Sequence, residues 1–245
     1  MKAFLLAALV LITATVDAAA QSPLVAELRR VSVRYHEDPS RLDTLREGLG
    51  KAAAADPRPE NLTALAQIEF IWGDVRAKTQ EEKLKAYDTG RQAAKRVAQA
   101  GPRDVVARFW YATNTARWGQ TNGVVQSLFL LPEVKREIGA ILDIESRFTP
   151  VYVLAGSVYY EVPALLGGDL AKSEELFRKG IALDGRFTML RVGLAKTLIK
   201  LKRTDEARKE LTAVIEEKAP RNLADWTLKD VPDAKRLLAE IDKGS

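Results

Sequence analysis

Apolar residues recur every three to four positions along most of the chain, which is the period of an amphipathic α-helix. Short breaks rich in Pro, Gly and Asp separate these segments, as at 56–59 and 101–104. Alternating strand patterns are nearly absent, and Asn122-Gly123, the one dipeptide typical of a hairpin turn, is flanked by helical patterns. The sequence therefore predicts an all-α protein. We expect helices over 22–36, 38–55, 61–75, 81–99, 105–118, 133–146, 151–160, 170–183, 188–200 and 205–217.

These helices pair up with a regular spacing. The first helices of successive pairs begin near 61, 104, 150 and 188, about 40 residues apart, and such a period is typical of an α-solenoid. Small and aromatic residues also recur at the offsets of a tetratricopeptide repeat (TPR), with Gly156 and Phe177 in one pair and Ala195 and Ala207 in the next. The sequence thus predicts a TPR-like helix-turn-helix repeat array over 60–245, preceded by an N-terminal helical segment over 21–59.

The first twenty residues have the pattern of a signal peptide. Lys2 precedes an apolar run over 3–14, and Ala18-Ala19-Ala20 offers small residues for cleavage before Gln21. An uncleaved anchor is the alternative, but the run is shorter than the ~20 residues that a transmembrane helix needs. No cysteine is present to carry a lipid. We therefore expect a periplasmic or secreted protein, cleaved near Ala20, with no direct membrane insertion.

Composition narrows the function. The 38 basic and 33 acidic residues give a net charge of +5, but the two signs are interspersed along the helices, so we expect no nucleic-acid partner. Cysteine is absent and His36 is the single histidine, which excludes thiolate nucleophiles, Cys-ligated metals and His-based triads. Ser157 lacks the second glycine of a nucleophile elbow. We expect no enzyme, no metal and no cofactor.

A Gly-Gly-Asp sequence precedes the segment 170–183. Glycines before a helix could cradle a phosphate, but Gly167, Gly168 and Asp169 lack the Lys-Ser/Thr pair and the strand of a phosphate-binding loop. The better interpretation is a structural turn that needs positive φ, with Asp169 capping the next helix.

The stretch 160–173, with its Tyr, Pro and Gly-Gly-Asp turn before an amphipathic helix, resembles the T-component family of TRAP (tripartite ATP-independent periplasmic) transporters. Segments 108–118, 220–226 and 233–238 also resemble that family, so the likeness covers about 61–242. It implies cryptic TPR-like units, association with a periplasmic solute-binding protein, and a homo-oligomer. Many relatives are lipoproteins, unlike this chain. A general periplasmic TPR-type scaffold that grips another exported protein, without a role in transport, is the alternative function.

Aromatic and polar side chains on the first helices make the candidate binding site. Residues at 111, 114, 115 and 118 share one helical stripe, and first helices of such repeats line a concave surface. Aromatic rings beside amide and guanidinium groups suit a small apolar or organic-acid ligand, with Arg108 and Arg117 as partners for a carboxylate. The alternative is that these rings pack between repeats as core. The candidate groove residues are Tyr111, Asn114, Arg117, Trp118, Tyr159 and Tyr160.

Overall fold

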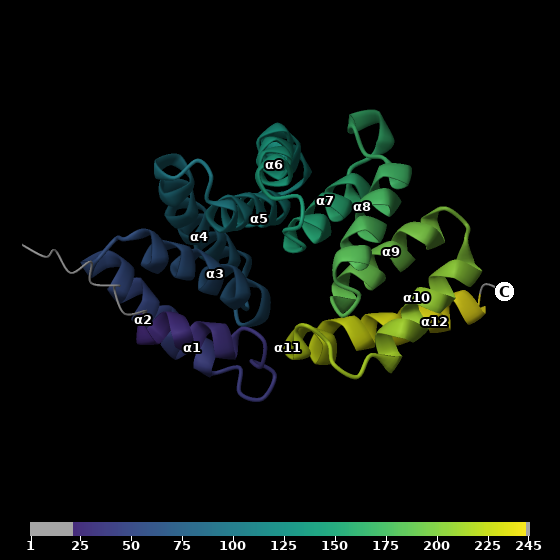
Figure 1. Ribbon diagram of the computed structural model, residues 1–245, viewed down its shortest axis with the longest axis horizontal. Coiled ribbons are helices and arrows are strands. Elements are labelled where there is room, and N and C mark those ends of the chain that lie inside the picture. Colours follow the sequence, from purple (N-terminus) through teal and green to yellow (C-terminus); the bar gives the residue numbers. More distant parts are fainter. Residues whose placement is uncertain (1–21, 244–245) are drawn as a thin grey trace, which may run out of the picture.

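The computed structural model describes residues 22–243, and among them every regular element is helical (Figure 1). This confirms the all-α prediction. The elements are α1 (Pro23–Val31), α2 (Arg41–Ala55), α3 (Pro59–Val75), α4 (Gln80–Ala100), α5 (Val105–Asn122), α6 (Val124–Ile144), α7 (Pro150–Glu161), the 3₁₀ turn η1 (Ala164–Leu166), α8 (Leu170–Leu183), α9 (Thr188–Lys200), α10 (Thr204–Glu216), the short α11 (Leu223–Asp225), the π-helical turn η2 (Trp226–Asp230) and α12 (Val231–Lys243).

The helices stack in chain order as an arch. Most long helices pack mainly against a helix that precedes or follows them in the chain, and α3 with α5 and α7 with α9 add contacts between alternate helices. Figure 1 shows the chain rising from α1, passing over α6, and descending to α12, so that α11 comes down beside α1. Nearest-neighbour packing of this kind is characteristic of a helical solenoid.

Three predicted helix boundaries were wrong by four residues or more. α1 ends at Val31 and not at 36, α5 continues past 118 to Asn122, and α6 starts well before 133. The sequence placed a break at Pro132, but α6 starts at Val124 and runs through Pro132. A proline inside a helix removes one backbone hydrogen bond. Pro132 lies on the exposed side of α6, where water can satisfy the carbonyl that loses its partner. The break falls instead at Gly123, whose φ of 111° turns the chain sharply between α5 and α6.

Glycines allow the helices of the C-terminal pairs to cross closely. The Phe177 ring of α8 is 1% exposed and lies between Gly156 of α7 and Gly193 of α9. A Cβ atom added at these glycines would lie 2.7 Å and 2.4 Å from the ring. Ser173 reinforces this crossing, since its hydroxyl donates to the Gly156 carbonyl at 2.9 Å. The need for glycine at Gly156 and Gly193 is therefore explained by the space that the Phe177 ring occupies.

The turn before α8 is a compact structural element. Gly167 has a φ of 92°, and a Cβ at Gly168 would lie 1.7 Å from the Val162 carbonyl oxygen. Asp169 then caps α8, because its Oδ1 accepts a hydrogen bond from the Lys172 amide at 2.9 Å. The three residues thus have structural roles. Gly167 is needed for its positive φ and Gly168 for lack of space for a side chain, while Asp169 caps the helix.

Two hydrophobic cores share the arch. The N-terminal core joins buried residues of α1 to α5, and the C-terminal core joins those of α6 to α12. The helices of the segment 21–59 are part of the first core, where Leu28 and Leu42 are almost completely buried. One residue from the far end of the chain, Ala224, also belongs to the N-terminal core. The two ends of the arch therefore meet.

Gly168→Val should destabilise the protein by on the order of a few kcal/mol, because the new side chain would overlap backbone that cannot move independently. Gly139→Val on α6 is the matched control, since nothing lies within 4 Å of a Cβ at that position. Thermal unfolding followed by circular dichroism measures the difference. An unchanged melting temperature for Gly168→Val would contradict the role assigned to this turn.

Asp230 carries a buried carboxyl group at the end of η2. The residue is 4% exposed, and its Oδ2 accepts a hydrogen bond from the Thr188 hydroxyl at 2.6 Å. Burial, with the nearby charges of Asp225 and Asp233, raises the pKa of Asp230 to about 7, although the Thr188 bond and Lys229 oppose the shift. The folded state therefore favours the protonated carboxyl.

A carboxyl group whose pKa is higher in the folded state contributes stability at low pH and loses it as the pH rises through that pKa. The Asp230→Asn variant cannot ionise at this position. Its melting temperature relative to wild type should therefore increase between about pH 4 and about pH 7, the ordinary and the folded-state pKa of this carboxyl. A constant difference between the two melting temperatures over this pH range would contradict the protonated state of Asp230.

Candidate functional site

Two of the predicted groove residues lie inside the packing of the N-terminal half. Tyr111 is 5% exposed, and its hydroxyl donates to the Glu133 carboxylate of α6. Burial and this carboxylate raise the pKa of Tyr111. Asn114 is completely buried, with its amide donating to the Ala66 carbonyl at 3.1 Å and its oxygen against Gly90. The structure places both side chains between helices, where no ligand touches them without a rearrangement.

Arg117 is neutralised by a carboxylate of α3. Its Nε donates to Asp74 Oδ1 at 3.1 Å, and Asp74 also accepts the Tyr87 hydroxyl at 2.9 Å. Burial favours the neutral form of Asp74, but Arg117 and Lys229 outweigh it and lower the pKa of that carboxyl. Arg108 is likewise paired with Glu137. Both arginines that the sequence offered to a ligand carboxylate thus have carboxylate partners within the chain.

Tyr159 and Tyr160 lie on α7, each under a lysine. Lys135 Nζ lies 4.7 Å from the Tyr159 ring centroid, and Lys200 Nζ lies 3.6 Å from that of Tyr160. Lys200 also donates to the Tyr160 carbonyl at 3.1 Å. No α7 residue lines the groove at Trp118 described next. The structure therefore does not gather the six predicted residues around one slot.

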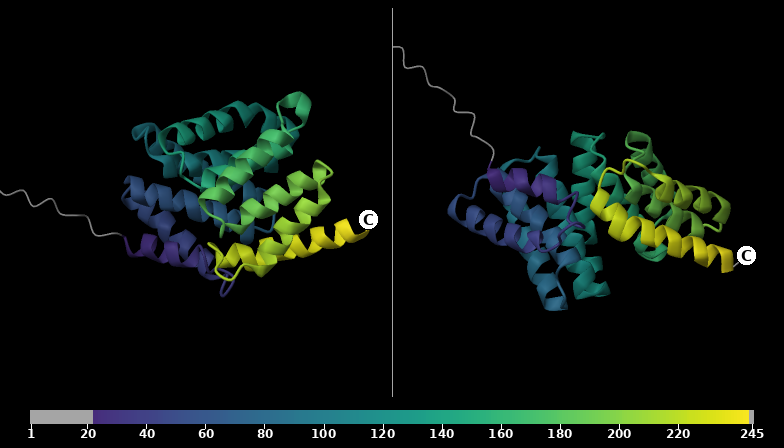
Figure 2. Two further views of the ribbon diagram at one scale, coloured as in Figure 1. Left: turned by 45° about the vertical axis from the view of Figure 1, so that its right-hand side comes forward. Right: turned by 90° about the horizontal axis from the view of Figure 1, so that it is seen from below.

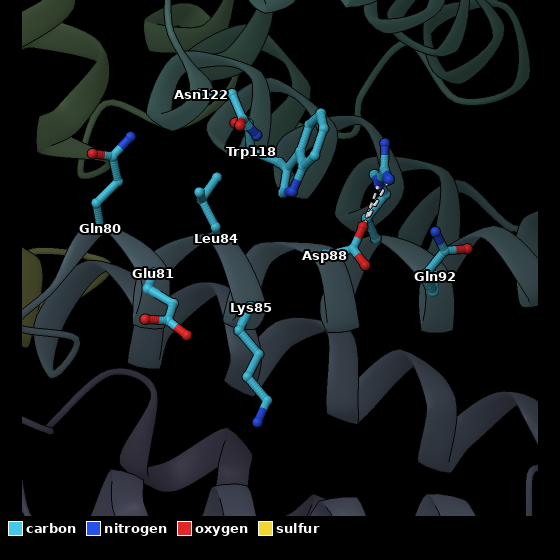
Figure 3. A pocket seen from close by; sticks show the side chains of 9 residues that line it. Gln80, Glu81, Leu84, Lys85, Asp88, Gln92, Trp118 and Asn122 are labelled. Atoms are coloured by element: carbon cyan, nitrogen blue, oxygen red, sulfur yellow. Dashed lines mark hydrogen bonds and ion pairs between the residues drawn. The ribbon is translucent and has the colours of Figure 1, made fainter.

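Trp118 lines an open groove between α4 and the end of α5, with a volume of about 820 Å³ (Figure 3). Figure 3 shows the α4 side chains in successive turns on one side, with Trp118 and Asn122 of α5 opposite them. We call this surface the Trp118 groove. It is lined by Gln80, Glu81, Leu84, Lys85, Asp88, Arg91, Gln92, Trp118 and Asn122.

Local sequence explains why α4 presents this stripe. Thr79 and Glu82 form a reciprocal capping box that fixes where α4 begins. The lining positions then recur at intervals of three and four residues, so they share one face of the helix. Gln80 ties this face to the end of α5, because its side chain donates to the Thr121 carbonyl at 2.8 Å. The predicted groove residues all lie on first helices, and the α4 half of the groove was missed, because its polar side chains have the spacing of any exposed helix face.

The Trp118 groove combines an apolar floor with a polar rim. The Arg91 guanidinium lies 4.5 Å from the Trp118 ring centroid and forms an ion pair of 2.7 Å with Asp88. Leu84 adds an aliphatic side chain to the floor, while the amides of glutamine and asparagine lie around it. A half-buried tryptophan with an arginine over its face is typical of the anchor residues at protein–protein interfaces.

Two features of the described residues that bear on catalysis are the metal-ligating side chains and the buried carboxylate of Glu69. No group of three or more His, Cys, Asp or Glu residues between 22 and 243 is placed to hold a metal ion. Glu69, the carboxylate beside aromatic residues in the sequence, is 4% exposed and accepts a hydrogen bond of 2.9 Å from Arg46. Burial raises the pKa of Glu69, and Arg46 opposes this shift. Its partner and its burial give it a structural role.

Between residues 22 and 243, no helix is both long enough and apolar enough to cross a membrane.

The family model of the TRAP transporter T-component matches residues 43–239. No curated protein matches the chain. Among solved structures, the thermophilic TPR protein TTC0263 of Thermus thermophilus is similar with a TM-score of 0.63 at 20% identity, covering 85% of this chain and 98% of that one. MamA is similar with a TM-score of 0.48 at 14% identity, over 84% and 96% of the two chains. The TTC0263 likeness confirms the predicted TPR-like solenoid.

Proposed function

The chain belongs to the TRAP transporter T-component family, and on this premise we propose that it is a periplasmic accessory protein that binds the solute-binding protein of such a transporter. The observation that carries the proposal is the family match, which spans most of the chain. The TPR-like fold supports it, because stacked helical repeats present extended surfaces to protein partners.

We place the contact at the Trp118 groove and the adjoining start of α6. Asn122 lines the groove, and the chain continues through Gly123 directly into α6. There Val124, Val125 and Phe129 are 74%, 69% and 76% exposed. An aromatic anchor beside exposed apolar side chains is the composition expected at the centre of a protein interface.

A protein side chain fits this surface better than a small ligand does. The groove is open to solvent on one side, whereas small-molecule sites usually enclose most of their ligand. The arginines expected to bind an organic acid are paired with Asp74 and Glu137. We therefore assign the groove to a protein partner, and we assign the chain no catalytic role. The predicted homo-oligomer stays a prediction.

Trp118→Ala should weaken binding of the purified TRAP solute-binding protein of the same organism by roughly 30-fold, about 2 kcal/mol, as expected for a buried aromatic anchor. Isothermal titration calorimetry measures the affinity, and thermal unfolding of the same sample shows whether the fold survives. Trp72→Ala is the matched control, because Trp72 also lies half-buried under an arginine, Arg46, at 3.7 Å, but on α3. The control should bind as wild type does.

Two results would contradict the proposal. One is full binding by a folded Trp118→Ala variant, which would remove the groove from the interface. The other is the absence of any binding by the wild-type chain, which would favour the general scaffold. Native mass spectrometry after mild purification adds a second measurement: a stoichiometric protein supports the proposal, while a small organic molecule in its place contradicts it.

We also propose that the chain is exported and cleaved before Gln21, at a site that lies outside the described residues. The supporting pattern is the apolar run followed by Ala18-Ala19-Ala20. N-terminal sequencing of the protein from the periplasmic fraction should begin at Gln21 or within a few residues of it. A full-length chain in the inner-membrane fraction would refute cleavage.

A further inference from the structure

The two ends of the arch are joined by a small set of contacts. The Ala224 amide donates to the Val33 carbonyl at 2.9 Å, and the Asn222 side chain donates to the Ser32 carbonyl at 3.4 Å. Both views in Figure 2 show α11 and η2 lying beside α1 and the turn that follows it. These contacts link positions about 190 residues apart, as the separation of Asn222 from Ser32 shows.

Charged and phenolic groups form the rest of this junction. The Tyr35 hydroxyl donates to Asp225 Oδ1 at 2.5 Å. Lys229 Nζ lies 2.9 Å from the same carboxylate and 3.4 Å from Asp74 Oδ2 on α3. Burial and the carboxylate of Asp225 raise the pKa of Tyr35, so its hydroxyl remains a donor. Lys229 therefore bridges a carboxylate from each half of the chain.

The two hydrophobic cores also meet at the middle of the arch. The rings of Phe109 and Trp110 on α5 pack against opposite cores, with centroids 5.0 Å apart. Phe109 continues to Phe148, in the turn before α7, at 5.5 Å. α7 makes few contacts with α5 and α6, so the helix pairs on either side are coupled weakly there. This turn, residues 145–149, is the natural hinge.

We propose that residues 222–230 form a clasp on the N-terminal helix and its turn, and that the clasp releases as a unit to convert the closed superhelix into an open arch. The clasp is held mainly by partly buried hydrogen bonds and ion pairs, which water would replace after opening, and Ala224 is the one residue of it in the N-terminal core. Release leaves the N-terminal core of α1 to α5 intact and moves α6 relative to the other helices of the C-terminal core. Opening increases the distance between the two halves of the arch, while the individual helices stay folded.

The test uses the absence of native cysteines, which permits spin labels at Gln99→Cys on α4 and Thr212→Cys on α10, both exposed and one in each half of the arch. Double electron–electron resonance measures the distance between the halves. The double variant Tyr35→Phe/Lys229→Met removes the hydroxyl bond and the bridging charge. It should show a second population at longer distance, with unchanged helical circular dichroism.

Tyr152→Phe is the matched control, because that tyrosine is also buried but donates locally, to the Ser146 carbonyl at 2.7 Å. It should keep the wild-type distance distribution. A folded double variant with an unshifted single distance would overturn the clasp, and so would the same shift in the control.

Hydrogen exchange of the wild-type chain tests the clasp if the double variant fails to fold. The Ala224 amide, which bonds to Val33, should exchange at least roughly tenfold faster than the core amides of α9, as expected for a locally opening unit. Exchange of both at one common rate would mean that the ends separate only when the whole protein unfolds, and would overturn the proposal.

Discussion

The close crossing of neighbouring helices is the constraint on which the rest of this structure depends. A solenoid has few contacts between distant repeats, so the angle and distance at each crossing determine the curvature of the whole. In the C-terminal half Phe177 sets that distance, and Gly156 and Gly193 make room for it. In the N-terminal half Asn114 against Gly90 and Tyr87 against Gly73 have the same role. The curvature that results brings residue 224 back to residue 33, and only then can Lys229 reach Asp74.

The same constraint divides the aromatic residues into two classes. Those in the middle of a helix, such as Tyr111, are enclosed by the next helix and are needed for packing. Trp118 lies near the end of α5, where the chain turns at Gly123 and the following helix leaves part of the ring uncovered. Function in such a repeat protein is therefore expected at helix ends and on outward faces, where the crossing geometry imposes less.

Much of the fold could be predicted from the sequence. The helical period of apolar residues, the capping residues and the helix-breaking residues are all local signals in the sequence. The helices predicted over 170–183 and 188–200 accordingly match α8 and α9 at both ends. Pro132 was misinterpreted because the cost of a proline within a helix depends on whether water reaches the freed carbonyl, and exposure is a property of the folded chain. The clasp could not be predicted either, since no local pattern relates Tyr35 to Asp225.

The candidate site was predicted less well, for a physical reason. Helical spacing shows that Tyr111, Asn114 and Trp118 share a stripe, but it does not show which neighbour covers that stripe. Asp74, which neutralises Arg117, lies 43 residues away in sequence, and only the packing of α3 on α5 brings the two together. The residues of α4 that complete the groove have ordinary polar character and acquire their role from the tryptophan opposite them.

The most direct measurement of the central claim is a hydrogen-exchange footprint of the solute-binding protein on this chain. Binding at the Trp118 groove should slow amide exchange in residues 80–92 and 118–129, while α2 and α12 keep their free rates. Protection confined to other helices, or no protection at a saturating concentration of the solute-binding protein, would contradict the proposed binding site at the groove.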